Sequence, residues 1–236
     1  MHQLDPLVAL RTGVGGQVRD KGLVVVGINT PEFEFEGNLD NVERALKEMD
    51  VRYPVAVDND YAVWQAFDNH YWPALYFVDA EGNVRHHHFG EGEYEESEMV
   101  LQMLLRAAGA DVDQGLVEIV PDGYEKQADW YSLGTPETYL DDVSAPGGSI
   151  SIQFHARDLH LVMGPPAHSQ PIRFRVTLNG EAPGPAHGLD VDEDGNGTAD
   201  YQRMYQLIRQ PGPIDDRLFK IEFLGPGVEA FVFTFG

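Results

Sequence analysis

The sequence of 236 residues contains no cysteine. This absence excludes disulfide bonds, thiolate metal sites and catalysis by a cysteine nucleophile, because each of them needs a thiol sulfur. Basic residues are also few, with 16 Lys and Arg against 39 Asp and Glu, for a formal net charge of −23 at pH 7. We therefore expect no binding to nucleic acid or to anionic membrane surfaces, since both require clustered positive charge.

Long hydrophobic runs are missing as well. No stretch approaches the roughly 20 apolar residues that a membrane-spanning helix needs. The residues Met1-His2-Gln3-Leu4-Asp5 also lack the basic and apolar regions of a signal peptide. We therefore expect no membrane insertion and a cytoplasmic location, the alternative being the soluble part of an extracytoplasmic, membrane-attached protein. Hydrophobic residues make up 42% of the chain, which predicts a globular protein.

The stretch around Trp72 and Pro73 organises the first half of the chain. Proline has no N–H to give to a sheet, so Pro73 is expected at the start of a strand rather than inside one. The apolar run Ala74–Val78 follows directly, and the residues Asp79-Ala80-Glu81-Gly82-Asn83 are typical of a turn. The pattern predicts a buried strand over 74–78, a tight turn and a second strand over 84–89.

Strands and helices alternate around this hairpin. The apolar run Leu23–Ile28 predicts a strand buried on both faces. Asp40 is expected to begin a helix over 41–49, and a helix after Glu93 is expected to bury Met99, Met103 and Leu104. A short helix over 61–67 and a stop at Gly109 complete an α/β pattern.

A different periodicity begins at Ser149. Apolar and polar residues alternate from there, and Asn179-Gly180 is a favoured hairpin turn. Several short strands with Gly and Pro turns predict an all-β sandwich over 149–236. The intervening residues 110–148 show little periodicity and are expected to form a linker.

Four segments occur in an order that resembles one family: residues 22–33, 53–61, 71–74 and 88–92. They resemble the redoxin branch of the thioredoxin-like fold, and in particular the C-terminal region of DipZ-type cytochrome c biogenesis proteins and their soluble relatives. The resemblance implies a thioredoxin-like domain over 1–109, with its first strand and redox helix truncated. It also implies that the sandwich is a jelly roll similar to carbohydrate-binding modules.

The activity of the family depends on a redox motif with two cysteines. Its Cys-x-x-Cys would fall at Pro6 and Ala9, and neither residue forms a thiolate. The family performs thiol–disulfide exchange, so this chain is expected to be inactive in that reaction. Either this copy is degenerate or truncated, or the redox segment belongs to a part of the protein outside this chain. The resemblance also implies that Pro73 is cis and that the Trp72 backbone pairs with an extended peptide.

An acidic loop in the second half is the strongest candidate for a metal site. Asp190, Asp192, Asp194 and Asn196 place oxygen ligands at alternate positions, as in the first half of an EF-hand calcium loop. The closing glutamate of that motif is missing. The two readings are a calcium site and an acidic surface turn held by Asx hydrogen bonds.

Three functions remain open from the sequence. The first is a thioredoxin-like protein whose redox cysteines are absent. The second is a non-catalytic module that binds a protein or a glycan, with a calcium-stabilised sandwich. The third is a small metalloenzyme in which His86 and His88, on one face of a strand, bind zinc or copper. Its alternative is a polar strand face without a metal.

Overall fold

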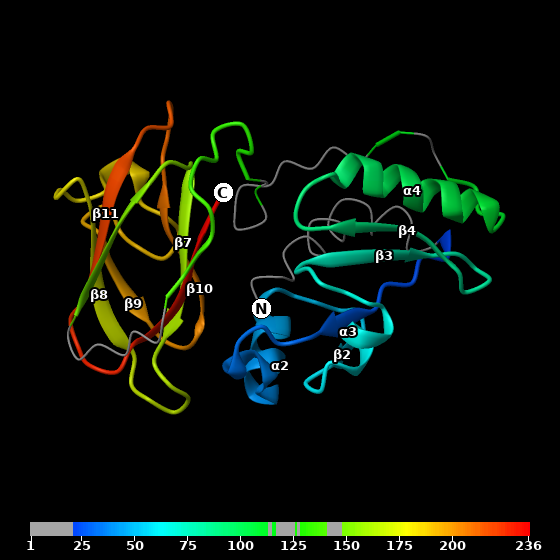
Figure 1. The fold of residues 1–236 in the computed structure, drawn as a ribbon, viewed down its shortest axis with the longest axis horizontal. Coiled ribbons are helices and arrows are strands. Elements are labelled where there is room, and N and C mark those ends of the chain that lie inside the picture. The colour runs from blue at the N-terminus through cyan, green and yellow to red at the C-terminus, as the bar shows by residue number, and fades with distance from the viewer. Residues whose placement is uncertain (1–20, 113–114, 117–125, 127, 141–147) are drawn as a thin grey trace. The chain divides into compact units, whose positions relative to one another are not determined.

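The computed structural model describes residues 21–112, 115–116, 126, 128–140 and 148–236 (Figure 1). The chain divides into two compact units, residues 1–126 and 127–236. None of the helices in these described ranges is long and apolar enough to cross a membrane. Pro6 and Ala9, where the redox motif would fall, lie outside the described residues.

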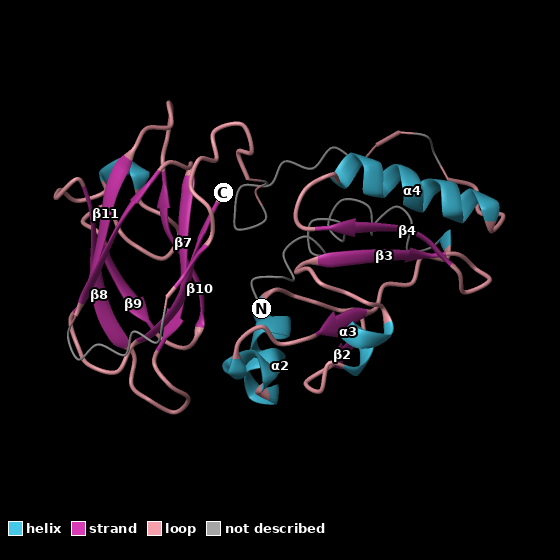
Figure 2. Cartoon of the chain, viewed as in Figure 1, coloured by secondary structure: helices cyan, strands magenta, loops and turns pink. Residues whose placement is uncertain are grey.

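Within its described residues, the first unit contains two separate two-stranded sheets (Figure 2). One pairs β1 with β2 in parallel, and the other pairs β3 with β4 in antiparallel. The elements, in chain order, are β1 (Gly27–Asn29), η3 (Glu34–Gly37), α2 (Leu39–Glu48), β2 (Val55–Val57), α3 (Ala62–Ala66), β3 (Ala74–Val78), β4 (Val84–Phe89) and α4 (Tyr94–Ala107). Strands and helices alternate along this unit, as the predicted α/β pattern requires.

The proline-led hairpin is confirmed. The Trp72–Pro73 peptide is cis, and β3 begins at the next residue. One carboxylate oxygen of Asp79 accepts hydrogen bonds from the N–H groups of Glu81 and Asn83, at 3.1 and 2.8 Å, which closes the turn into β4. Leu75 and Phe77 on β3 are buried, as a core strand requires.

The predicted burial of Leu23–Ile28 is wrong. Only Gly27–Asn29 forms a strand, because its ladder with β2 is three residue pairs long. Val24 is 78% exposed and Val26 is 56% exposed. Among the described residues no strand pairs with the other edge of β1. An apolar run in the sequence therefore lies along an open surface.

The two longer helices differ from their predictions at their ends and faces. Helix α2 is capped by Asn38, whose side chain accepts a hydrogen bond from the N–H of Asp40, so the helix starts earlier than predicted. In α4, Met99 and Met103 are more than half exposed, and the predicted apolar face is wrong in those two positions. The buried face carries polar groups instead, including Gln102, which hydrogen-bonds Glu98.

The second unit is β-rich and consists of two four-stranded sheets (Figure 1). Their orders are β10-β7-β12-β5 and β6-β11-β8-β9, and every pair is antiparallel. The elements are β5 (Thr138–Tyr139), β6 (Ser149–Phe154), β7 (Asp158–Gly164), β8 (Ile172–Leu178), η4 (Gly184–Ala186), β9 (Asn196–Ala199), β10 (Arg203–Arg209), β11 (Arg217–Phe223) and β12 (Glu229–Phe235). Because β5 belongs to a sheet, part of the predicted linker is structured.

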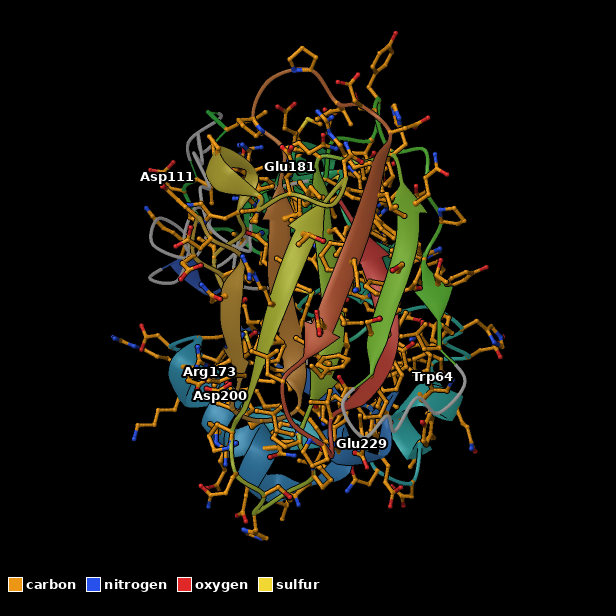
Figure 3. All side chains as sticks on the ribbon, turned by 90° about the vertical axis from the view of Figure 1, so that its left-hand side faces the viewer. Trp64, Asp111, Arg173, Glu181, Asp200 and Glu229 are labelled. Carbon is orange, nitrogen blue, oxygen red and sulfur yellow. The ribbon has the colours of Figure 1, made fainter. Side chains whose placement is uncertain are left out.

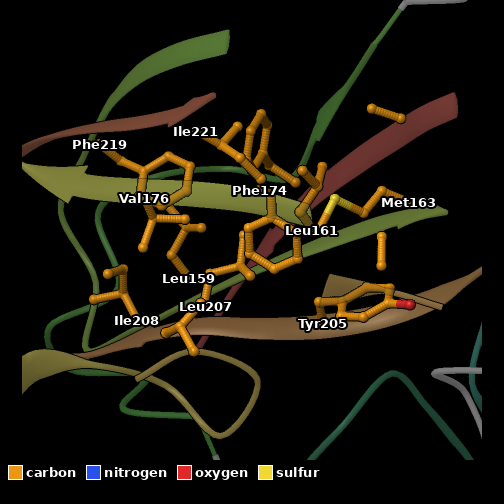
Figure 4. Close-up of a cluster of buried hydrophobic side chains, with 14 of the residues drawn as sticks. Leu159, Leu161, Met163, Phe174, Val176, Tyr205, Leu207, Ile208, Phe219 and Ile221 are labelled. Carbon is orange, nitrogen blue, oxygen red and sulfur yellow. The ribbon is translucent and has the colours of Figure 1, made fainter. Parts of the chain in front are cut away.

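The two sheets share one hydrophobic core (Figure 4). Phe174 and Phe219 come from one sheet and Leu161 and Tyr205 from the other, and all four have no exposed surface. Burying a large apolar side chain stabilises a fold by about 1.5–3 kcal/mol. The Tyr205 hydroxyl donates to a carboxylate oxygen of Asp200 at 2.6 Å, so the one polar group of this set is satisfied.

A buried ion-pair cluster lies on β7 and β10. Asp158 is 1% exposed and receives hydrogen bonds from the guanidinium groups of Arg157 and Arg209, at 2.6 and 2.8 Å. Burial alone would raise the pKa of Asp158, but these hydrogen bonds outweigh it and hold the pKa below its usual value. Burial lowers the pKa of the nearby His160 to about 4, so this imidazole is neutral at pH 7.

Candidate functional site

A cavity of about 900 Å³ lies within the first unit. Val24, Val26 and Ile28 line it from the β1 side, and Leu75 and Phe77 line it from β3. Leucines of α4 and the rings of Trp64 and Trp72 complete the wall. The lining is mainly apolar, which suits an apolar ligand or an apolar segment of chain.

Trp72 is held in this lining by two contacts. Its indole N–H donates to the carbonyl oxygen of Thr30 at 3.2 Å, and its ring packs against Trp64 with centroids 4.1 Å apart. Within the described part of the chain, the backbone N–H and C=O of Trp72 have no hydrogen-bond partner. An extended peptide next to Trp72 could satisfy both groups, as added strands do in other proteins.

Asp58 holds in place Thr30 and Trp64, the two residues that contact Trp72. Its carboxylate accepts hydrogen bonds from the Thr30 hydroxyl at 3.0 Å and from the N–H groups of Val63 and Trp64 at 2.9 Å each. Burial acts to raise the pKa of Asp58, but these hydrogen bonds outweigh it and lower the pKa. Sequence analysis missed Thr30 and Asp58, although an aspartate shortly before a predicted helix is an N-terminal signal.

The histidines of β4 do not assemble a metal centre. His88 is buried, and its Nδ1 lies 3.0 Å from a carboxylate oxygen of Glu93. His86 packs against Phe77 across the hairpin, with ring centroids 5.3 Å apart. In the ranges that the structure describes, no three His, Cys, Asp or Glu side chains gather to hold a metal ion. His86 and His88 therefore lack a third ligand among those residues.

The acidic loop of the second unit is held by hydrogen bonds within the protein. Asp190 accepts from the backbone N–H of Gln206 at 2.7 Å and from Arg203 at 2.9 Å. Asp192 accepts from the backbone N–H of Asn196 at 2.7 Å, and this contact is the largest of those that lower the pKa of Asp192. These two carboxylates thus serve different partners, and the geometry is that of an Asx-stabilised turn.

A glycine fixes the shape of this loop. Gly195 has a φ of +83°, and a Cβ at this position would lie 2.2 Å from the carbonyl oxygen of Val176. Asn196 then begins β9, which pairs with β8. The residues predicted as calcium ligands therefore shape the turn that leads into a strand.

We expect calcium to leave the stability of the protein unchanged. Asp190 and Asp192 already have hydrogen-bond partners, and a ligand raises the melting temperature only if it binds the folded state preferentially. Calorimetry of the chain in excess calcium and in excess chelator should give the same melting temperature. A calcium-dependent rise that disappears in Asp194→Asn would contradict this expectation and restore the calcium site.

Comparison with known proteins shows which proteins this chain resembles. Residues 126–236 match the family model described as the thioredoxin-like C-terminal domain. Over 124 residues the chain is 42% identical to protein DipZ of Mycobacterium bovis, a match that covers 52% of this chain and 17% of that protein. The chain is thus similar to proteins of the thioredoxin-like family, over just under half of its length for the family model.

Two further matches have lower sequence identity. Thiol-disulfide oxidoreductase YkuV of Bacillus subtilis is 35% identical over 77 residues, which cover 31% of this chain and 52% of YkuV. The solution structure of a thioredoxin-like protein in the oxidized form has a TM-score of 0.39 and 28% identity, and covers 44% of this chain and 68% of that one. The chain thus spans about half of YkuV and less than a fifth of DipZ.

Proposed function

We propose that this chain is a thioredoxin-like protein that does not itself exchange thiols and disulfides, and that it binds extended peptide segments beside Trp72 and Pro73. The observation that carries the proposal is the combination of a sequence without cysteine and a cavity of about 900 Å³ at the cis-proline strand. Thiol–disulfide exchange needs an attacking thiolate, whereas strand addition needs only backbone geometry and apolar contacts.

Three features of the cavity support a peptide as the ligand. The backbone groups of Trp72 have no partner in the described ranges, so they are available to a chain that runs alongside. β3 pairs with β4 alone among the described strands, which leaves its other edge open. The exposed Val24 and Val26 offer contacts to alternate side chains of an added segment. Together they favour an extended, apolar stretch.

We also infer that the second unit is a jelly roll. Strands β5 to β8 alternate between the two sheets, and the last three strands, β10, β11 and β12, alternate again. This interleaving of two four-stranded antiparallel sheets is typical of jelly-roll domains, which include lectins and capsid proteins. The strand order supports the architecture and assigns no ligand to it.

The chain should not accelerate the reduction of insulin by dithiothreitol. It has no sulfur that can attack a disulfide, so the turbidity of insulin should develop at the rate seen with dithiothreitol alone. The test uses the purified chain at several concentrations. A rate that increases in proportion to the chain would contradict the proposed lack of thiol exchange.

Peptide binding should depend on the exposed valines of the cavity. Replacing both Val24 and Val26 by Asp places two carboxylates where an apolar segment would lie, and we expect affinity to fall about tenfold or more. The probe is reduced and alkylated insulin B chain, an unfolded polypeptide without free thiols, with binding followed by fluorescence anisotropy. Both valines are largely exposed, so the variant should keep its melting temperature.

The matched control is Leu39→Asp. Leu39 is 60% exposed on α2, and the cavity lining does not include it. Loss of binding in the valine variant together with normal binding in the Leu39 variant would support the site. Equal binding by all three proteins, or no binding by the unaltered chain, would remove the proposed peptide-binding function.

A further inference from the structure

The outward face of the β6-β11-β8-β9 sheet has an unusual charge for this protein. Figure 3 looks onto this sheet, with Arg173 toward one end of β8 and Glu181 beyond the other. On β8 the side chains of Phe174 and Val176 are buried, so Arg173 and Arg175 lie on the opposite, exposed face. The outward side chains of this sheet are therefore exposed to solvent. Their charges can be compared with the charge of the whole chain.

Basic residues outnumber acidic ones on this face. The outward side chains of β8 and β11 include Arg173, Arg175 and Lys220, against the single acid Glu222. In the whole chain, by contrast, 39 acidic residues stand against 16 basic ones. The strands β6 and β9 contribute the neutral polar residues Ser149, Ser151, Gln153, Asn196 and Thr198. A local positive surface thus lies on a strongly negative molecule.

The two arginines of this face are available to a ligand. Within the part of the chain that the structure describes, no ion pair or hydrogen bond engages the guanidinium group of Arg173 or Arg175. Lys220 lies at the limit of an ion pair, with its Nζ 4.0 Å from a carboxylate oxygen of Glu222. The other arginine pairs of this unit, such as Arg209 with Asp158, are already formed inside the protein.

The spacing of the arginines matches an extended chain. They are two residues apart on one strand, which places their positions about 7 Å apart along the sheet. Alternate side chains of any extended peptide repeat at the same distance. On the neighbouring strand Lys220 is opposite Thr177 and adds a third cation beside this row, whereas the acid Glu222 is directly opposite Arg175. Carboxylates at alternate positions of a peptide would meet Arg173 and Arg175 in register.

We propose that this face binds an extended acidic segment of another protein, with Asp or Glu at alternate positions. Arginine recognises carboxylates through paired N–H groups, and the surrounding Ser, Thr, Asn and Gln side chains can hydrogen-bond the peptide backbone. The outward side chains of β6, β8, β9 and β11 include no aromatic ring on which nucleic acid bases could stack.

The test measures binding of a fluorescein-labelled Glu-Thr repeat peptide to the full chain. A Gln-Thr repeat of equal length is the uncharged control. We expect the acidic peptide to bind more tightly at low salt than at high salt, because exposed ion pairs are screened. The variant with Arg173→Glu and Arg175→Glu should bind it about tenfold more weakly, since each attraction becomes a repulsion.

The matched variant carries Arg44→Glu and Arg85→Glu. Both residues are exposed on the first unit, so the net charge changes equally while the sheet face stays intact. If both variants bound the acidic peptide equally weakly, the net charge of the protein would explain the effect, and the proposal would be overturned. Binding of the Gln-Thr peptide as tight as that of the acidic one would also overturn it. A third outcome would overturn it as well: a salt-sensitive dimer of the chain that dissociates when Arg173 and Arg175 are replaced. The ligand of this face would then be a second copy of the chain.

Discussion

Replacing Asp158 with alanine should lower the free energy of unfolding of the second unit by about 3–5 kcal/mol, the usual cost of removing one partner of a buried ion pair. The carboxylate is 1% exposed and lies between Arg157 and Arg209. Their guanidinium groups, which are 14% and 19% exposed, would remain inside the protein without this counter-charge. Urea denaturation followed by circular dichroism measures the loss.

The control for this prediction is Asp216→Ala. Asp216 forms an ion pair with His155 at 2.7 Å, but its side chain is 69% exposed, and such surface pairs contribute less than about 1 kcal/mol. If the free energy of unfolding fell by a similar amount in the two variants, burial would not explain the contribution of the Asp158 ion pairs to stability. Far-UV spectra that match the unaltered chain would confirm that both variants fold.

Acid should act on the same cluster. The pKa of Asp158 is lower in the folded protein than its ordinary value of about 3.9, so the unfolded chain binds a proton more readily. The stabilisation is therefore complete above the ordinary pKa and is lost as the pH falls through the folded value. The alanine variant should lack this part of the acid dependence. Parallel pH profiles of the two proteins would contradict the assignment.

Replacing Phe174 with alanine should cost about 3–5 kcal/mol of stability, as truncation of a buried phenylalanine usually does. Phe174 is fully buried between the sheets and meets the ring of Tyr205 edge to face, with centroids 6.2 Å apart. The loss has two sources: the apolar surface no longer buried, and the cavity that the neighbouring side chains cannot fill. Calorimetry should record a lower melting temperature for the second unit.

Leu218→Ala provides the comparison for the core substitution. Leu218 lies on β11 and is 51% exposed, so its truncation should change stability by about 0.5 kcal/mol or less. A mild effect in Phe174→Ala, close to that of Leu218→Ala, would show that Phe174 does not pack as the structure places it.

Periodicity predicted much of the second unit. Ile150, Phe174 and Phe219 alternate with polar neighbours, and strands stand at the predicted positions of β6, β8 and β11. β7 was missed, although Leu159, Leu161 and Met163 alternate in the same way. Its other face carries Asp158 and His160 but also the buried Val162, so the alternation breaks in the middle of the strand. An alternation of apolar and polar residues identifies a strand only where one face of the strand is exposed to water and therefore polar.

The candidate site was predicted less completely. Trp72 and Pro73 could be named because proline restricts where a strand begins. The position of Asp58 before a predicted helix was a usable signal, but its contact with Thr30 and the contact of Thr30 with Trp72 could not be foreseen, since they join residues far apart in the sequence. The exposure of Val24 and Val26 also depends on which strands are neighbours in space. Local sequence carries no information on contacts between distant residues or on which strands are neighbours.

The position of β12 has a consequence for biosynthesis. This strand lies between β7 and β5, and β11 likewise lies between β6 and β8. Each sheet thus lacks an inner strand until late in synthesis, when β11 and then β12 leave the ribosome. The strands made earlier would wait with open hydrogen-bonding edges, a state prone to aggregation. A chaperone that holds the nascent chain during this interval should increase the yield of native protein.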